Sequence, residues 1–223
     1  MEAASEIPEI EKWKNWRCQT VAERHAFFLE RAGFLKSPEA LVAFRAVDRA
    51  DFLRPQDIHL SMVDMPIPIG HEQSNSQPSL VAAMVEALRV RPGDKVLDVG
   101  SGSGWTAALL GNLAEPDGAV FGAERIPELA ELARYNLGKY ELENVRIKQS
   151  DELDCWADEG PFDAIMVAAT AEELPPELAD QLAEGGRMVI PIGKDLAFVG
   201  RRNGTVEIEG TLSGVDFVPL VTS

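Results

Sequence analysis

Short apolar runs and stretches of helical spacing alternate along the larger, carboxyl-terminal part of the chain. The runs predict β-strands, and apolar positions that recur every three or four residues predict helices. The predicted strands are 95–99, 119–123, 145–149, 164–169 and 187–191, and the predicted helices are 78–88, 105–113, 127–140 and 176–183. This alternation favours a doubly wound, mostly parallel sheet of the α/β class.

The two ends of the chain follow other patterns. Residues 11–54 have helical apolar spacing, interrupted at Gly33 and at Ser37-Pro38, which predicts two or three short helices. Near the other end, Asn203-Gly204 is a hairpin turn signal between two alternating segments. The strands predicted in that region are 197–201, 205–209 and 216–220. We therefore expect an amino-terminal helical segment and antiparallel strands at the carboxyl-terminal edge of the sheet.

A region rich in Pro, Gly, Ser, Asn and Gln lies between these parts, at residues 58–77. It predicts a long loop of the kind that usually serves binding or catalysis. We expect a helical segment at 1–57 that packs on a domain formed by 58–223. With 223 residues and 45% hydrophobic content, the two form one compact unit in this interpretation.

Charge and cysteine content narrow the function classes. The chain has 37 acidic and 21 basic side chains and a formal net charge of −16, which argues against nucleic acid or an anionic membrane as a partner. The amino terminus lacks the basic and apolar regions of a signal peptide, so we expect a cytoplasmic protein. For the oligomeric state, we favour a monomer. Cys18 and Cys155 stand apart from other cysteines and histidines, so we expect neither a disulfide framework nor a metal site.

A glycine-rich turn follows the first predicted strand of the sheet, in the sequence Val96-Leu97-Asp98-Val99-Gly100-Ser101-Gly102-Ser103-Gly104. Glycines let the backbone approach a ligand closely, and the first amides of the next helix face it. Glu124 ends the following strand, where a carboxylate can accept hydrogen bonds from ribose hydroxyls. The GxGxG spacing differs from the dinucleotide pattern GxGxxG and favours S-adenosylmethionine over NAD. On these residues alone, the turn can also be a simple connection.

The loop region contains a specific motif, Asp64-Met65-Pro66-Ile67-Pro68-Ile69-Gly70 followed by Gln73-Ser74-Asn75-Ser76-Gln77-Pro78. This motif resembles the substrate loop of protein-L-isoaspartate O-methyltransferases. The resemblance extends to 47–52, 98–104, 160–165, 181–187 and 215–220, and it covers about residues 40 to 220. It implies a Rossmann-like methyltransferase fold, S-adenosyl-L-methionine as cofactor, and peptides or proteins that carry isoaspartate as substrates.

The resemblance also implies roles for individual residues. Ser76 takes the place of the family's active-site residue. Substrate binding falls to Ile69, Gly70, His71 and Val218. Cofactor binding falls to Gln73, Ser74, Asn75, Ser76, Asp98, Val99, Gly100, Ser101, Gly102, Ser103, Gly104, Glu124, Asp151 and Glu152. From the residues alone, the N-cap of the helix that follows is the favoured role of Ser76, and Asp151 can be an ordinary exposed loop aspartate.

Three pairs depart from the family pattern. His71-Glu72 replaces a small, glycine-containing pair, Ser74-Asn75 replaces a Thr-Ile type pair, and Asp151-Glu152 replaces Asp-Gly. The leading hypothesis is methylation of the α-carboxylate of L-isoaspartyl residues, which leads through a succinimide to partial repair to aspartate. Because the substrate loop is altered, a carboxyl methyltransferase for a dedicated biosynthetic peptide is the first alternative. A module that binds S-adenosylmethionine without catalysis is the second.

Overall fold

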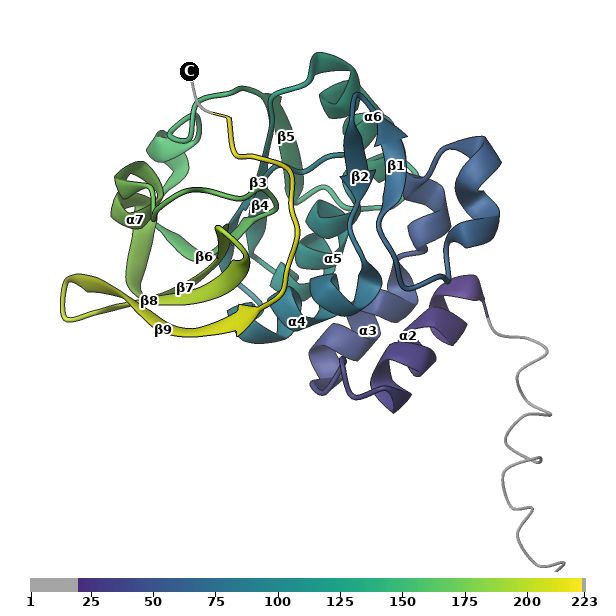
Figure 1. The fold of residues 1–223 in the computed structure, drawn as a ribbon, viewed down its shortest axis with the longest axis horizontal. Coiled ribbons are helices and arrows are strands. Elements are labelled where there is room, and N and C mark those ends of the chain that lie inside the picture. Colours follow the sequence, from purple (N-terminus) through teal and green to yellow (C-terminus); the bar gives the residue numbers. More distant parts are fainter. Residues whose placement is uncertain (1–19, 222–223) are drawn as a thin grey trace, which may run out of the picture.

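The computed structural model describes residues 20–221 (Figure 1). Cys18 and the first part of the helical region predicted at 11–54 lie outside the described residues. Seven strands form one sheet in the order β5-β4-β3-β6-β7-β8-β9, and β1 and β2 form a separate hairpin. The strands are β1 (Ile67–Gly70), β2 (Gln73–Asn75), β3 (Lys95–Val99), β4 (Ala119–Glu124), β5 (Val145–Gln149), β6 (Phe162–Val167), β7 (Leu182–Ile192), β8 (Asp195–Arg202) and β9 (Thr205–Ser213).

The helices lie before β1 and in the connections between β2 and β7. The α-helices are α2 (Val21–Arg31), α3 (Pro38–Ala46), α4 (Pro78–Leu88), α5 (Trp105–Ala114), α6 (Pro127–Leu137) and α7 (Pro176–Gln181). Short 3-10 helices are η2 (Arg49–Phe52), η3 (Pro55–Leu60) and η4 (Ala157–Glu159). No helix of the described region is long and apolar enough to cross a membrane.

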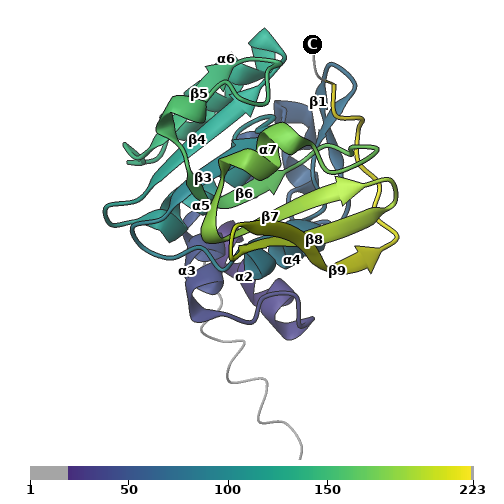
Figure 2. The same ribbon diagram turned by 90° about the vertical axis from the view of Figure 1, so that its left-hand side faces the viewer.

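The parallel part of the sheet is β5-β4-β3-β6-β7, and β8 and β9 extend it in antiparallel orientation. The doubly wound α/β class with antiparallel carboxyl-terminal strands is therefore confirmed. Strand β3 is the middle strand of this parallel part. Its residues Val96, Leu97 and Val99 are buried, because helices cover both faces of the sheet. Helices α4 and α5 cover one face and α7 covers the other (Figures 1 and 2).

The amino-terminal helices pack on the outer side of α4 and α5. Helix α2 begins with a capping box in which Thr20 and Glu23 satisfy each other's backbone amides, and Ser37 caps α3. Apolar residues of both helices belong to the same hydrophobic cluster as α4, α5 and β3. This shared core fixes the turn between α2 and α3 relative to α4.

Two predictions about the loops and ends need correction. The segment predicted as a strand at 216–220 is irregular, and its backbone pairing is an isolated parallel bridge between Pro219 and Thr170, which lies beyond the end of β6. The reason is that the chain turns away after β9 at Gly214, with φ of 87°, and Pro219 has no amide proton to donate to a ladder. The region 58–77 includes part of η3 and the β1–β2 hairpin, whereas the sequence predicted only a loop.

Candidate functional site

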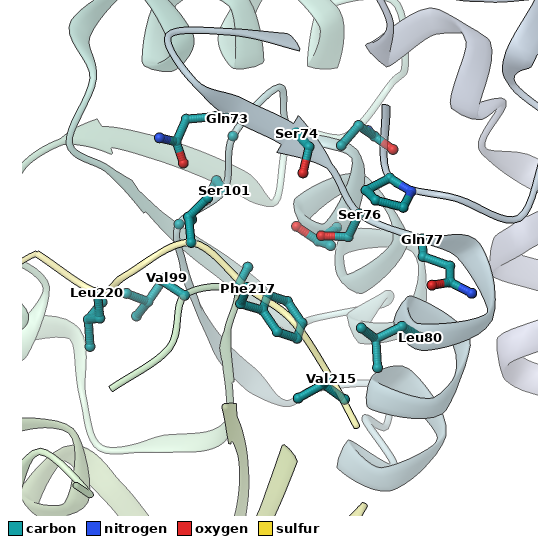
Figure 3. Close-up of a pocket in the computed structure, with 18 of the residues that line it drawn as sticks. Gln73, Ser74, Ser76, Gln77, Leu80, Val99, Ser101, Val215, Phe217 and Leu220 are labelled. Atoms are coloured by element: carbon teal, nitrogen blue, oxygen red, sulfur yellow. The ribbon is translucent and has the colours of Figure 1, made fainter. Parts of the chain in front are cut away.

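A cavity of about 850 Å³ opens at the carboxyl ends of β3 and β6, where the order of the parallel strands reverses direction. In open α/β sheets this switch point is where ligands bind. Three of the segments that line the cavity are the glycine-rich loop after β3, the end of the β1–β2 hairpin with the start of α4, and the segment after β9. Figure 3 shows Ser101 and Val99 on one side of it, Ser76, Gln77 and Leu80 on another, and Phe217 between them.

The glycine-rich loop has the backbone conformation that its sequence predicts. Gly100, Gly102 and Gly104 all have positive φ, at 81°, 54° and 94°. A side chain at Gly104 would also meet Ala133 of α6, at 3.2 Å from a Cβ. Glycine is therefore required both for the turn and for the close packing of α5 against α6.

Glu124 connects this loop to the end of β4. Its two carboxylate oxygens accept hydrogen bonds from the backbone amides of Gly102 and Ile126, each at 2.9 Å, and only 5% of the residue is exposed. A carboxylate has lone pairs for about four hydrogen bonds, so Glu124 can still accept from hydroxyl groups of a ligand in the cavity. Glu124 thus both holds the tip of the glycine loop and lines the cavity.

Asp98 lies beneath the loop and does not line the cavity. Its side chain is fully buried, and the Thr106 hydroxyl donates a hydrogen bond to Oδ2 at 3.0 Å. Burial, with a smaller contribution from the charge of Glu124, raises the pKa of Asp98 to about 6, although hydrogen bonds from Ser101 and Thr106 oppose the shift. Asp98 therefore supports the loop from below.

Ser76 lies at the entrance to α4, and its hydroxyl makes no hydrogen bond within residues 20–221. The N-cap position is Gln77, and Asp64 caps the helix from a distance, because its Oδ1 accepts from the Ser79 amide at 2.8 Å. The capping alternative for Ser76 is therefore not realised. Ser76 lines the cavity, so its hydroxyl is available to a ligand there.

Arg49 holds the segment that carries Ser76. The residue is only 1% exposed, and its guanidinium donates to the carbonyl oxygens of Met65 at 2.8 Å and Ser76 at 2.9 Å and to Asn75 Oδ1 at 2.7 Å. Further bonds reach the carbonyls of Ser61, Val63 and Asn75. Burial lowers the pKa of Arg49 to about 10, so it is still charged at neutral pH. One buried cation thus joins both ends of the 58–77 region.

Most of the residues predicted for the site come together around the cavity. Those that line it are Gln73, Ser74, Asn75, Ser76, Val99, Gly100, Ser101, Gly102, Ser103, Glu124, Asp151, Glu152 and Val218. Gly104 packs behind the loop, and Ile69 is buried with its Cδ1 3.3 Å from where a Cβ on Gly102 would lie. Gly70 and His71 belong to the hairpin turn and do not line the cavity, and neither does the exposed Glu72.

Sequence reasoning missed the role of Arg49. Arg54, five residues further along the chain, forms an ion pair with Asp57 at 2.8 Å. Phe34, Lys36 and Phe217 also line the cavity without having been singled out. Arg49 lies in a segment of family resemblance, but a sequence gives no signal for bonds to carbonyls of distant loops.

The geometry fits a nucleoside cofactor with a charged tail. The volume lies in the range of about 300–1,000 Å³ that is usual for small-molecule sites. At its glycines the loop presents backbone without side chains, and Glu124 supplies an anionic acceptor at the end of the adjacent strand. Ser101, Ser103 and Asp151 add polar groups along the same wall. These residues together meet the requirements for holding S-adenosylmethionine.

Comparisons with known proteins agree with this geometry. A protein from Vibrio cholerae named protein-L-isoaspartate O-methyltransferase is 42% identical over 202 residues, which is 90% of this chain and 95% of that protein. One of the same name from Methanocella arvoryzae is 42% identical over 179 residues, 78% of this chain and 94% of its own.

A similar fold has been solved in Plasmodium falciparum. The crystal structure of a putative protein-L-isoaspartate O-methyltransferase in complex with S-adenosyl-L-homocysteine superimposes with a TM-score of 0.81 at 26% identity. It covers 92% of this chain and 100% of that one. The family model for protein-L-isoaspartate(D-aspartate) O-methyltransferase matches residues 24–223, and the chain therefore belongs to this family.

Proposed function

We propose that this chain methylates the α-carboxylate of L-isoaspartyl residues in damaged proteins or peptides, with S-adenosylmethionine as the methyl donor. The observation that carries the proposal is the single cavity lined by both Glu124 with the glycine loop and Ser76 with the start of α4. One part suits a nucleoside, and the other offers donors to an anionic oxygen. The family and the solved complex of its Plasmodium relative support the same cofactor.

When bound, S-adenosylmethionine supplies a methyl group on a positively charged sulfur. A substrate carboxylate has an ordinary pKa of about 4 and is already ionised at neutral pH, so the protein needs no strong general base. The task of the chain is positioning, and holding reactants in line can be worth several kcal/mol. Ser76 donates from its hydroxyl, and the amino-terminal end of α4 adds partial positive charge.

The rest of the machinery keeps Ser76 in place. Arg49 binds the Ser76 carbonyl, and Asp64 caps α4 directly after Ser76. Hydrogen bonds from the Ser79 amide and from the Gln77 and Ser79 side chains hold the pKa of Asp64 below its usual value, although partial burial opposes them. The cap therefore stays ionised across the neutral range.

The methyl ester that results is a better electrophile than the carboxylate, so it cyclises spontaneously to a succinimide. Hydrolysis of the succinimide returns part of the material as normal aspartate, which gives a repair function. In this proposal the enzyme works in the cytoplasm as a monomer, on proteins and peptides rather than nucleic acids or membranes.

A dedicated peptide substrate is the second candidate, and Ser74 and Asn75 favour it. Both line the cavity at positions where the family has a Thr-Ile type pair. The side chain of Asn75 is engaged by Arg49 and lies 3.4 Å from Ser103 Oγ, so Ser74 is the residue free to alter specificity.

One pair of measurements tests these candidates. Calorimetry measures S-adenosylmethionine binding, and a transfer assay then measures base-labile methyl ester formed on isoaspartyl peptides and on matched aspartyl peptides. We expect binding, and ester on the isoaspartyl peptides alone. Ester on neither peptide despite tight binding would contradict the repair function and favour a dedicated peptide or a non-catalytic binding module.

A further inference from the structure

The cavity continues beyond Ser76 into a groove along α4. We call it the distal groove and define it by Phe34, Lys36, Ala83, Leu212 and Val215, which line it. Phe34 and Lys36 come from the turn between α2 and α3, Ala83 from α4, and Leu212 and Val215 from the end of β9 and the segment after it. Amino-terminal and carboxyl-terminal parts of the chain thus form its two walls.

The wall that carries Lys36 is fixed to α4 by one carboxylate. Glu86 Oε1 accepts from the amides of Lys36 at 2.7 Å and Ser37 at 2.8 Å and from the Ser37 hydroxyl at 3.1 Å. Three hydrogen bonds to a charged acceptor hold the turn firmly. The backbone of Lys36 therefore keeps a constant position relative to the start of α4.

Lys36 contributes a positive charge to the cavity of a strongly acidic protein. Of the side chains from residues 20–221 that line the cavity, only Lys36 and Arg125 are cationic, and Arg125 follows Glu124 at the cofactor end. The Lys36 ammonium forms no ion pair within that range, neither with Glu86 nor with Asp216 on the opposite wall. It is exposed and free to bind an anionic group in the groove.

The distance along α4 separates the backbone of Lys36 from the position of the reacting carboxylate. An α-helix rises about 1.5 Å per residue, so Pro78 and Glu86 are about 12 Å apart along the axis, and Lys36 lies beside Glu86. An extended peptide advances about 3.3 Å per residue, so this separation corresponds to about four residues of substrate.

We propose that the distal groove is a subsite for the peptide on one side of the isoaspartyl residue, and that Lys36 there selects a carboxylate side chain about four positions away. This inference rests on the proposed function and adds a sequence preference to it. Phe34 and Leu212 offer exposed apolar surface in the same groove as Lys36, which suits the intervening part of a peptide chain.

The test uses isoaspartyl peptides of one sequence that carry either glutamate or glutamine at the third, fourth or fifth position on each side. We expect KM to be about two- to fivefold lower for glutamate at one of these positions, as befits an exposed ion pair, with kcat unchanged. Lys36→Gln should abolish the preference, and Lys36→Glu should reverse it. Higher ionic strength should weaken it in the wild type.

Arg91→Glu is the matched control, because Arg91 is exposed and lies outside the cavity. Reversing the charge of this residue changes the net charge of the protein as much as Lys36→Glu does. It should leave the preference unchanged. Equal KM values for all the peptides in the wild type, a preference that survives Lys36→Gln, or an equal effect of Arg91→Glu would overturn the subsite. In each of these cases the isoaspartyl peptides are still methylated, whereas failure of the proposed function would leave all of them unmodified.

Discussion

At the scale of single residues, the hydroxyl of Ser76 faces the cavity without a partner in the described part of the chain. We predict that Ser76→Ala lowers kcat by about 10- to 100-fold, since a hydrogen bond to a charged group is worth about 1.5–3 kcal/mol. The Kd for S-adenosylmethionine should change little. Transfer kinetics on isoaspartyl peptides and calorimetry measure the two effects.

Ser213→Ala is the control for this variant, because it removes a hydroxyl from the far wall of the same cavity. It should leave kcat unchanged. Equal turnover by Ser76→Ala and the wild type would remove Ser76 from the mechanism.

Asp98, beneath the glycine-rich loop, makes the stability of the protein depend on pH. Its pKa is raised to about 6 in the folded protein, mainly by burial, against an ordinary value of 3.8. The folded state therefore binds this proton more tightly than the unfolded chain, and its contribution makes the protein less stable as pH rises from about 4 to about 6. The full effect is up to ~3 kcal/mol. Asp98→Asn should remove this pH dependence.

Denaturant unfolding of both proteins between pH 4 and 8 checks the prediction. The readout is the change with pH in the difference between their free energies of unfolding, because the new amide has its own packing cost that does not depend on pH. Parallel pH profiles would show that Asp98 is already ionised in the folded protein near pH 4.

At the scale of elements, two hairpins share one turn geometry but differ in sequence. His71 and Glu72 have φ of 51° and 59° between β1 and β2, and Asn203 and Gly204 have φ of 52° and 77° between β8 and β9. Left-handed backbone costs about 1 kcal/mol or more for most residues, whereas asparagine and glycine adopt it readily. The β1–β2 turn is therefore the strained one.

We predict that the double substitution His71→Asn and Glu72→Gly raises the free energy of unfolding by about 1 kcal/mol, which corresponds to about 2–4 °C in Tm. Gly204→Ala should lower it by a similar amount, and no atom lies within 4 Å of the added Cβ, so the loss comes from φ alone. Calorimetric melting compares the two. Destabilisation by the first change would mean that the His71 or Glu72 side chain makes a contact that offsets the strain.

The β1–β2 turn also shows which kind of feature the sequence pattern did not predict. The alternation of apolar runs and helical spacing predicted the parallel sheet and its helices, because both depend on burial along a local period. The β1–β2 hairpin was missed, since His71-Glu72 carries no turn signal. The strand predicted at 216–220 was wrong, because the apolar residues there face the cavity and the core rather than a neighbouring strand. The role of Arg49 depends on hydrogen bonds to backbone carbonyls of separate loops, and no sequence pattern marks such bonds.

At the scale of the whole molecule, the cavity is assembled from parts that no single segment could provide. The glycine loop belongs to the sheet, Ser76 is held by Arg49, and the segment after β9 is attached through Thr170, whose amide donates to the Val218 carbonyl at 2.8 Å. The turn that carries Lys36 is bound to α4. Since helices α2 to α5 and the sheet also share a hydrophobic cluster, we propose that residues 20–221 unfold as one cooperative unit.

Cofactor binding should then stabilise the whole molecule. A ligand that binds only the folded state adds about 2.7 kcal/mol at 100 times its Kd, and this should raise Tm by about 5–11 °C. We expect S-adenosylmethionine to produce this shift in the wild type and in Ser76→Ala, and NAD to produce none. Glu124→Gln should lose most of the shift, because it removes the anionic acceptor from the cavity and one acceptor from the glycine loop. An undiminished shift in Glu124→Gln would mean that the ligand lies elsewhere, away from the carboxyl end of β4.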